Sequence, residues 1–261
     1  MTSGGGRFVP GPLRPIARRV ARALRDRGIL GGARPAPAVP ASRPATADEP
    51  IPEKTAAELR DYWRDPPDGN VPASYRDRPE RSAYLVELVR RHVAPGSRIL
   101  EIGCNVGRNL HYLYEAGYTE LSGIEISAAA VDALRASYPD TAARAAVQVA
   151  AAEEALPGFA DGAFDLVFTM AVLEHIHPES EWLFDEIRRI DARHLITIED
   201  ERSKSWRHYP RDYGAIFGGR GFEELWTEPV PAETGLPSGF RARLFQIVPV
   251  AVATPTTAGE G

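Results

Sequence analysis

The chain has 261 residues, of which 43% are hydrophobic, and a formal net charge of -5. This length and composition suffice for one domain with a sizeable buried core, with or without appendages. The modest negative charge disfavours a general nucleic-acid binder, which would carry a basic face. We therefore expect a soluble globular protein with no nucleic-acid partner.

Targeting and redox signals are weak. No apolar run approaches the roughly 18 residues that span a bilayer, and the first residues lack the apolar core of a secretory signal. We expect a cytoplasmic protein without stable membrane insertion. The lone Cys104 cannot form an internal disulfide and has no partner cysteines for a zinc cluster, so no metal is predicted.

Residues 1–50 differ from the rest of the chain, because they hold nine Arg against three acidic residues and end in a Pro/Ala-rich run. Apolar residues recur at helical spacing among the arginines, at positions 13, 16, 20 and 24. One interpretation is a basic amphipathic helix that visits an anionic membrane surface or a partner. The other is a disordered arm, which we favour because the apolar stripe is short and lacks aromatic anchors.

Residues 51–94 are expected to form a helical cap of two helices, separated by a loop at 66–70. The first helix carries Ala56, Leu59, Tyr62 and Trp63 on one stripe, and the second carries an apolar stripe over 84–93. Two interpretations of the aromatic pair stay open. Tyr62 and Trp63 either cover a site as a lid or pack against the flank of the sheet.

The central stretch predicts a strand, a glycine turn and a helix. A short apolar run at 99–102 follows a Pro-Gly turn signal, as is typical of a buried parallel strand. The backbone must turn sharply between Gly103 and Gly107, and an amphipathic pattern then begins at Leu110. Such a turn leaves room for a ligand against bare backbone and the first amides of the helix.

Apolar stretches alternate with helical patterns over the following hundred residues. Four of them are predicted strands: 121–126, 145–150, 164–170 and 194–198. This alternation predicts an α/β fold with a doubly wound, mostly parallel sheet and helices on both faces. The stretches 222–227 and 241–250 have no helix between them. They predict an antiparallel pair at one edge, with an antiparallel C-terminal edge strand, in a seven-stranded sheet.

Polar side chains follow several predicted strands. Ligands of such sheets bind outside the carboxyl ends of the strands, where the strand order switches. Gly103, Glu125, Glu153 and the pair Glu174/His175 occupy these ends. Glu125 follows the second strand, where a carboxylate can accept both hydroxyls of a ribose.

Three motifs then resemble those of a known family. Residues 101–107, which read EIGCNVG, resemble the Glu-x-Gly-x-Gly-x-Gly motif of class I S-adenosylmethionine-dependent methyltransferases of the small-molecule kind. Residues 121–127 resemble the second motif, and 164–168 with 172–175 resemble the fourth strand and its loop. The glycines do not form the Gly-x-Gly-x-x-Gly pattern, which disfavours a dehydrogenase.

The resemblance implies a Rossmann-like fold over residues 95–252, a flexible tail at 253–261 and S-adenosyl-L-methionine as cofactor. Asn105 stands where the family has its middle glycine, and asparagine tolerates left-handed backbone. Glu101 would bind the loop amides or the methionine amino group. The third strand leaves the Ala152 amide and Glu153 as adenine-side candidates. The implied cofactor-binding residues are Glu101, Gly103, Asn105, Gly107, Glu125, Ile126, Ala152, Glu153 and Met170.

His175 has two interpretations. It is either a general base for methyl transfer to a hydroxyl, or a residue that caps a helix or bonds a backbone carbonyl. The acidic run at 199–201 either faces a substrate amine or a divalent ion, or is a solvated turn, which we prefer. His208, Tyr209 and Tyr213 lie where the family often forms its acceptor pocket.

We therefore expect a methyltransferase (EC 2.1.1.-) acting on a small-molecule acceptor, and in particular on a hydroxyl oxygen of a sugar or secondary metabolite. The Asn/Asp-Pro-Pro-Tyr/Phe signature of nucleic-acid and protein amide methylation does not follow the fourth strand, where residues 169–172 read TMAV. The alternative is an inactive cofactor- or partner-binding module on the same fold, with the basic arm as its working part. The sequence leaves the oligomeric state open.

Overall fold

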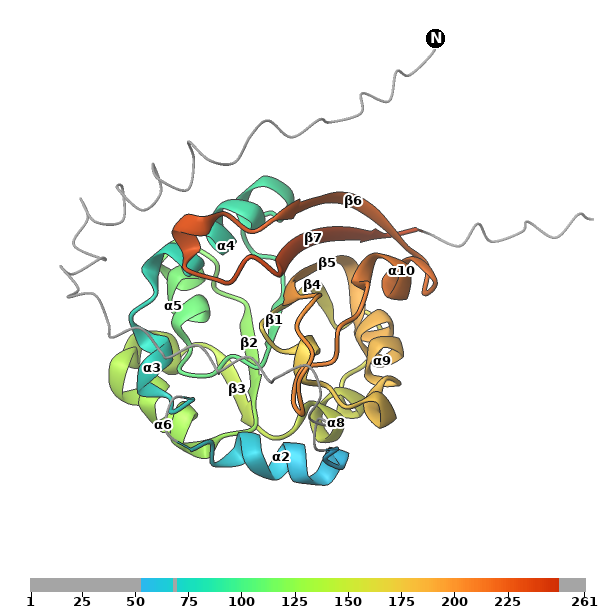
Figure 1. The fold of residues 1–261 in the computed structure, drawn as a ribbon. Coiled ribbons are helices and arrows are strands. Elements are labelled where there is room, and N and C mark those ends of the chain that lie inside the picture. The colour runs from blue at the N-terminus through green and yellow to red at the C-terminus, as the bar shows by residue number, and fades with distance from the viewer. Residues whose placement is uncertain (1–52, 68–69, 249–261) are drawn as a thin grey trace, which may run out of the picture.

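The computed structural model describes residues 53–67 and 70–248 (Figure 1). The arm at 1–50 and the tail at 253–261 expected from the sequence lie outside these residues. Within the described ranges, no helix combines the length and the apolar character needed to cross a bilayer.

A seven-stranded sheet forms the centre of the molecule, in the order β3-β2-β1-β4-β5-β7-β6. Strands β1 to β5 run parallel, and β7 runs antiparallel to both of its neighbours. The order reverses between β1 and β4, which makes this the switch point of the sheet. The strands are β1 (Ile99–Ile102), β2 (Leu121–Glu125), β3 (Ala146–Val149), β4 (Phe164–Met170), β5 (Asp191–Asp200), β6 (Phe222–Pro229) and β7 (Phe240–Ile247).

The C-terminal strands pair antiparallel at one edge of the sheet, as expected, and their order within the pair follows from their side chains. β7 lies inside, next to β5, and β6 forms the edge. In β7, Ala242, Leu244 and Phe245 are fully buried. In β6, Glu223 and Glu224 are exposed, and charged side chains are suited to an edge that must stay unpaired.

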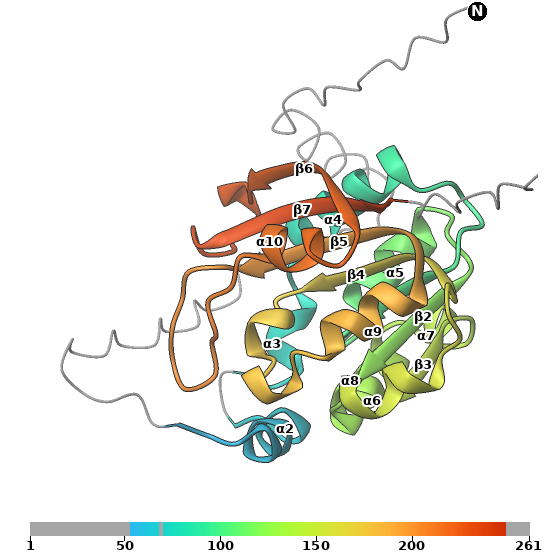
Figure 2. The ribbon, with the colours of Figure 1, turned by 90° about the vertical axis from the view of Figure 1, so that its right-hand side faces the viewer.

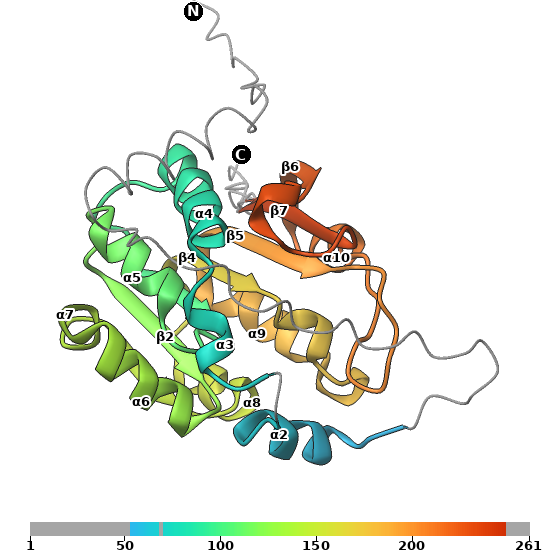
Figure 3. The same ribbon diagram turned by 60° about the vertical axis from the view of Figure 1, so that its left-hand side comes forward.

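Helices cover both faces of the sheet (Figures 2 and 3). On one face, α4 (Pro79–His92), α5 (Arg108–Glu115) and α6 (Ala128–Ser137) contribute to one apolar cluster. On the other face, α8 (Ala152–Ala155), α9 (Leu183–Ile190) and α10 (Tyr213–Gly218) contribute to a second. The two clusters are the core layers of a doubly wound fold. Short helices complete the connections: α3 (Ala73–Arg76), α7 (Pro139–Ala142), η1 (Leu156–Gly158), η2 (Leu173–His175), η3 (Pro178–Ser180) and η4 (Ala232–Thr234).

The two helices expected in the N-terminal cap have different positions. α2 (Ala56–Arg64) lies at the end of the sheet where the parallel strands finish (Figure 3), whereas α4 packs on a sheet face. A capping box between Thr55 and Glu58 starts α2. Arg60 and Arg64 form ion pairs with Glu153 and Glu154 of α8. These contacts hold α2 across the carboxyl ends of the strands.

Candidate active site

A cavity of about 330 Å³ lies at the carboxyl ends of β1, β2 and β4, with α2 over it. Its walls come from the loop after β1, the ends of β2 and β4, α2, and the segment around 207–208. The cavity is lined by His175 and by every cofactor-binding residue that the family resemblance implies, except Gly107. The structure therefore brings the predicted site residues together at the switch point.

The loop after β1 is built for close approach of a ligand to the backbone. Gly103 has φ 72°, and a Cβ atom there would lie 2.5 Å from Cγ2 of Val172. Asn105 has φ 47°, and its Oδ1 accepts the Val106 N–H at 2.8 Å. Asparagine thus stabilises the left-handed turn with its own side chain, as the sequence predicts.

Gly107 lies behind the loop rather than in the cavity wall. It has φ 67°, and a Cβ atom there would lie 2.2 Å from Cδ1 of Leu134 on α6. Glycine at this position lets α6 pack against the start of α5. Any contribution of Gly107 to ligand binding is therefore made through the shape of the loop.

Glu125 is fixed by two backbone amides. Its Oε2 accepts the Asn105 N–H and its Oε1 accepts the Ser127 N–H, both at 2.8 Å. Burial raises the pKa of Glu125, and the bonds from Ser127 and Asn105 oppose that rise. Each carboxylate oxygen keeps a further lone pair for a ligand hydroxyl, because an oxygen of this kind can accept two hydrogen bonds.

Glu101 is only 2% exposed and carries an unsatisfied oxygen. Its Oε1 accepts a hydrogen bond from Nδ2 of Asn109 at 2.7 Å. Its Oε2 has no hydrogen-bond partner in the part of the chain that the structure describes. Burial raises the pKa of Glu101 to about 8. An orphaned buried oxygen at a cavity wall is a place where a ligand donor would be favourable.

Glu101 does not bond the loop amides, which is one of the two roles considered for it. The N–H groups of Gly103 and Cys104 donate instead to the carbonyl of Ile124, at 2.8 and 2.9 Å. The Asn105 amide is taken by Glu125. The remaining role, contact with a ligand amino group, stays a prediction.

A buried polar network from three elements holds Glu101 in place. Ser82 of α4 donates to Oδ1 of Asn109 at 2.7 Å, and Arg108 Nε donates to the Ser82 hydroxyl at 2.8 Å. Arg108 also donates to the carbonyl of Tyr75. The sequence pattern missed Arg108 and Asn109, because polar residues in the first turn of a helix are ordinarily exposed. Their position directly after Gly107 is the available signal.

The third-strand candidates lie at the start of α8. Ala152 and Glu153 line the cavity, and Oε1 of Glu153 is 3.5 Å from Nη1 of Arg60. Ile126 also lines the cavity, and Met170 lines it at the end of β4. Through Arg60, the wall is tied to the helix that covers it.

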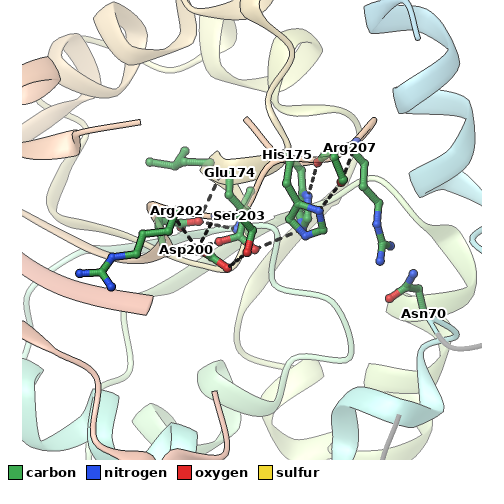
Figure 4. Close-up of polar contacts among 12 residues, drawn as sticks. Asn70, Glu174, His175, Asp200, Arg202, Ser203 and Arg207 are labelled. Atoms are coloured by element: carbon green, nitrogen blue, oxygen red, sulfur yellow. Dashed lines mark hydrogen bonds and ion pairs between the residues drawn. The ribbon is translucent and has the colours of Figure 1, made fainter. Parts of the chain in front are cut away.

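His175 stands on the wall formed by the loop after β4. Its Nδ1 lies 2.7 Å from the carbonyl oxygen of Arg207, and its Nε2 lies 3.6 Å from Oε1 of Glu174 (Figure 4). The rings of Trp63 and His208 have centroids 4.6 and 4.7 Å from that of His175. Burial, reinforced by the neighbouring His208, lowers the pKa of His175 to about 3.

The carbonyl contact fixes the tautomer of His175. An Nδ1 that faces a carbonyl oxygen must carry the proton, so Nε2 carries the lone pair. The interpretation of His175 as a residue that bonds a backbone carbonyl is therefore confirmed. The base role is compatible with this bond, because Nε2 is the other nitrogen, and it stays a prediction.

The interpretation of 199–201 as a solvated turn is wrong, because β5 continues through Asp200 and the side chains are enclosed. Glu199 Oε2 accepts the Val172 N–H at 2.9 Å, and the Asp200 N–H donates to Oε2 of Glu174. Glu201 forms an ion pair with Arg243 at 2.7 Å. Burial raises the pKa of both Glu174 and Glu199. These acids fix the loop that carries His175.

Of the aromatic pair on α2, Trp63 lies as the lid interpretation expects, and Tyr62 packs on the segment around 206–207 instead of the flank of the sheet. Trp63 lines the cavity and packs on His175, as expected for a lid residue. Tyr62 packs edge-on against Trp206 with ring centroids 4.9 Å apart, and its hydroxyl accepts a hydrogen bond from Arg207 at 2.9 Å. Arg207 also lines the cavity, and the sequence pattern did not single it out.

Among the three residues expected near an acceptor pocket, His208 lines the cavity. Tyr213 is fully buried within the second apolar cluster. The backbone N–H of Tyr209 donates a hydrogen bond to the carbonyl oxygen of Glu174 at 2.9 Å. An acceptor contact therefore stays a prediction for His208 and is wrong for Tyr213, which is the first residue of α10 and whose ring is buried in the core.

Comparisons with known proteins agree with this geometry. Residues 100–192 match a family model described as a methyltransferase domain. The chain is 25% identical over 136 residues to 2-methyl-6-phytyl-1,4-hydroquinone methyltransferase from Synechocystis sp., a match that covers 52% of this chain and 42% of that protein. The aligned region thus spans less than half the length of this curated relative.

Solved structures share the fold. Magnesium protoporphyrin IX methyltransferase from Synechocystis PCC 6803, solved with bound SAH, is similar with a TM-score of 0.56 and 18% identity, over 74% of this chain and 99% of that one. The (4+2)-cyclase SpnF is similar with a TM-score of 0.51 and 18% identity, over 62% and 79%. Identities this low show the common fold.

Proposed function

We propose that this chain is a class I S-adenosylmethionine-dependent methyltransferase that transfers a methyl group to a small-molecule acceptor, a proposal supported by the methyltransferase-domain match over residues 100–192. One observation carries the proposal: a common cavity is lined both by the predicted cofactor residues and by His175, His208 and Arg207 on the facing elements. A cofactor and an acceptor can therefore meet within it. The cytoplasmic location expected from the sequence is part of this proposal.

The residues present fit S-adenosylmethionine, which supplies a methyl group already activated on a sulfonium. Glu101 Oε2 is an orphaned, buried carboxylate oxygen, suited to the ammonium group of the methionine part. Glu125 keeps lone pairs for the ribose hydroxyls, and its orientation is set by two amides. Ile126, Ala152 and Glu153 would hold the adenine side, and Met170 lines the cavity at the end of β4.

The acceptor atom we propose is a hydroxyl oxygen of a sugar or secondary metabolite. Transfer to a hydroxyl releases a proton, and Nε2 of His175 carries the lone pair that can receive it. Trp63 offers an aromatic face to the acceptor, and Arg207 offers donors. The names of the hydroquinone and protoporphyrin relatives describe small-molecule acceptors, which supports this substrate class.

Alignment of the reacting atoms and exclusion of water are the main tasks left to the protein. α2 covers the cavity with Trp63, and its ion pairs with α8 anchor this cover. A proton acceptor is required only for hydroxyl-like acceptors. The identity of the acceptor atom can therefore be tested through His175.

The test is formation of S-adenosylhomocysteine with a panel of sugars, polyols and phenols. With an accepted hydroxyl substrate, His175→Ala should lower kcat by about 10²- to 10⁴-fold and leave the Kd for S-adenosylhomocysteine within about twofold. His194→Ala is the matched control, because His194 lies toward the amino end of β5. Full activity of His175→Ala would contradict the base role, and no turnover with any panel member would count against the proposed acceptor class.

A further inference from the structure

Three side chains with metal-ligating groups converge on one wall of the cavity: Glu174, His175 and His208. Each offers one ligand atom, and these atoms lie within 4.8 Å of one another. Within this group, Oε1 of Glu174 and Nε2 of His175 lie 3.6 Å apart (Figure 4). Among the described residues, no second group of His, Cys, Asp and Glu side chains comes together in this way.

In each of the three side chains, a hydrogen bond to the polar atom that is not the proposed ligand atom fixes the orientation. Nδ1 of His175 donates to the Arg207 carbonyl at 2.7 Å, and Nδ1 of His208 lies 2.6 Å from the Ser205 hydroxyl. Oε2 of Glu174 accepts the Asp200 N–H, which leaves Oε1 on the side of His175. Outer hydrogen bonds of this kind fix the ring orientation of metal-bound histidines and raise their affinity.

The nearest arginine is turned away from the imidazoles. Nη1 of Arg207 donates to the Tyr62 hydroxyl at 2.9 Å, and the guanidinium lies over the Trp206 ring at 5.7 Å from its centroid. Figure 4 shows its side chain directed toward Asn70, on the far side from Glu174. The Arg207 guanidinium therefore does not take the place of a cation between the three ligands.

We propose that Glu174, His175 and His208 form a binding site for a divalent transition-metal ion. Two imidazole nitrogens and one carboxylate oxygen suit Zn²⁺ or Fe²⁺, whereas Mg²⁺ and Ca²⁺ prefer oxygen ligands throughout. Donors bound to one ion at about 2.1 Å lie about 3 to 4 Å apart. The Glu174–His175 pair already has this spacing, and the ligand atom of His208 lies within 4.8 Å of the other two.

A metal ion would change the role of His175 in the proposed reaction. Nε2 would then be a ligand instead of a base, and the ion would hold and acidify an acceptor hydroxyl at one of its open positions. This consequence depends on the proposed function. Metal binding itself does not depend on it, so the two can fail separately.

The experiment is a titration of untagged, full-length protein with ZnCl₂ after treatment with a chelator, in the presence of millimolar Mg²⁺. We expect one equivalent of Zn²⁺ to bind with a Kd of about 1 μM or tighter, and His208→Ala to weaken it at least tenfold. His194→Ala should bind as the wild type does. Thermal unfolding of each variant shows whether it folds.

Cobalt gives a second readout that does not depend on activity. Co²⁺ should produce visible absorption bands that Zn²⁺ removes and that His208→Ala and Glu174→Gln lack. Absence of stoichiometric Zn²⁺ binding by the wild type would overturn the proposal, and so would equal binding by a folded His208→Ala variant. If either result is obtained, S-adenosylhomocysteine binding by the same preparations would show whether the proposed cofactor site is correct independently of the metal site.

Discussion

Glu101 is the residue whose environment makes the clearest prediction, because burial raises its pKa to about 8 from an ordinary value of 4.5. The folded state therefore favours the protonated form. The stabilisation is fully present below pH 4.5 and is lost as the pH rises to 8. Glu101→Gln stays neutral throughout, so its free energy of unfolding should exceed that of the wild type by about 4 kcal/mol at pH 8.

Urea unfolding of both proteins at pH 4 and pH 8 measures this difference. Near pH 4 the two free energies of unfolding should agree within about 0.5 kcal/mol, since the side chain at position 101 is then mostly neutral in both the folded and the unfolded state. Other buried acids, such as Glu174 and Glu199, contribute equally to the pH dependence of both proteins, so their contributions cancel in the difference. A difference that is the same at both pH values would show that Glu101 is not the titrating group.

A comparison of alanine substitutions at Gly103 and Gly96 distinguishes the cost of backbone strain from the cost of side-chain crowding. Both have positive φ, but a Cβ atom at Gly96 meets nothing within 4 Å, whereas one at Gly103 lies 2.5 Å from Val172. Gly96→Ala should lower the free energy of unfolding by about 1 to 2 kcal/mol, the cost of left-handed backbone. Gly103→Ala should cost about 1 to 3 kcal/mol more, from overpacking.

Chemical denaturation of the two variants tests this, and Val172→Ala provides a rescue. Because the crowding involves the Val172 side chain, the added substitution should recover part of the loss in Gly103→Ala. Equal losses in Gly96→Ala and Gly103→Ala would mean that the loop and the end of β4 move apart freely, contrary to the structure.

At the level of single elements, α2 has a well-formed N-terminal cap and is held to the rest of the molecule by side-chain contacts at one end of the sheet. Thr55 and Glu58 form its capping box, and the ion pairs to α8 are partly exposed and individually weak. Thr55→Ala should cost about 1 kcal/mol locally. Amide exchange in α2 should then accelerate about fivefold, with the melting temperature and exchange in α5 unchanged. Unchanged exchange in α2 would show that tertiary contacts hold this helix.

β7 is tied to its surroundings by Arg243. This buried arginine forms ion pairs with Glu201, Glu224 and Asp212. Arg243→Met leaves these acids without their partner and should lower the free energy of unfolding by about 2 to 4 kcal/mol. Arg241→Met is the matched control, because Arg241 is more exposed and lies 3.8 Å from Glu201. Similar losses in the two variants would contradict the role of Arg243.

For the whole molecule, the architecture can be predicted from the sequence, because the patterns that indicate strands and turns lie within short stretches of the chain. Apolar runs bounded by glycine turns predict the strands, and residues 164–170 coincide with β4. The seven-stranded, Rossmann-like sheet is confirmed by the topology. Residues 100–192 match a methyltransferase-domain model, in agreement with the resemblance seen in the sequence. The domain boundaries in the terminal arms stay predictions.

Contacts between distant segments could not be predicted in the same way. His208 meets His175 because β5 is longer than its apolar run suggests, and the loop after it returns to the cavity. The acids at 199–201 look like a solvated turn by composition, yet they bond the loop after β4. Arg108 lies on a helix whose partner, Ser82, comes from α4. Only packing brings such pairs together.

The central claim is that the cavity at the switch point binds the cofactor through Glu125. Calorimetric titration with S-adenosylhomocysteine tests it on the wild type, Glu125→Gln and the control Glu120→Gln, which alters an exposed residue just before β2. We expect one molecule bound with a Kd of about micromolar, at least tenfold weaker binding in Glu125→Gln, and no change in Glu120→Gln. No binding by the wild type, or equal binding by a folded Glu125→Gln variant, would contradict the claim.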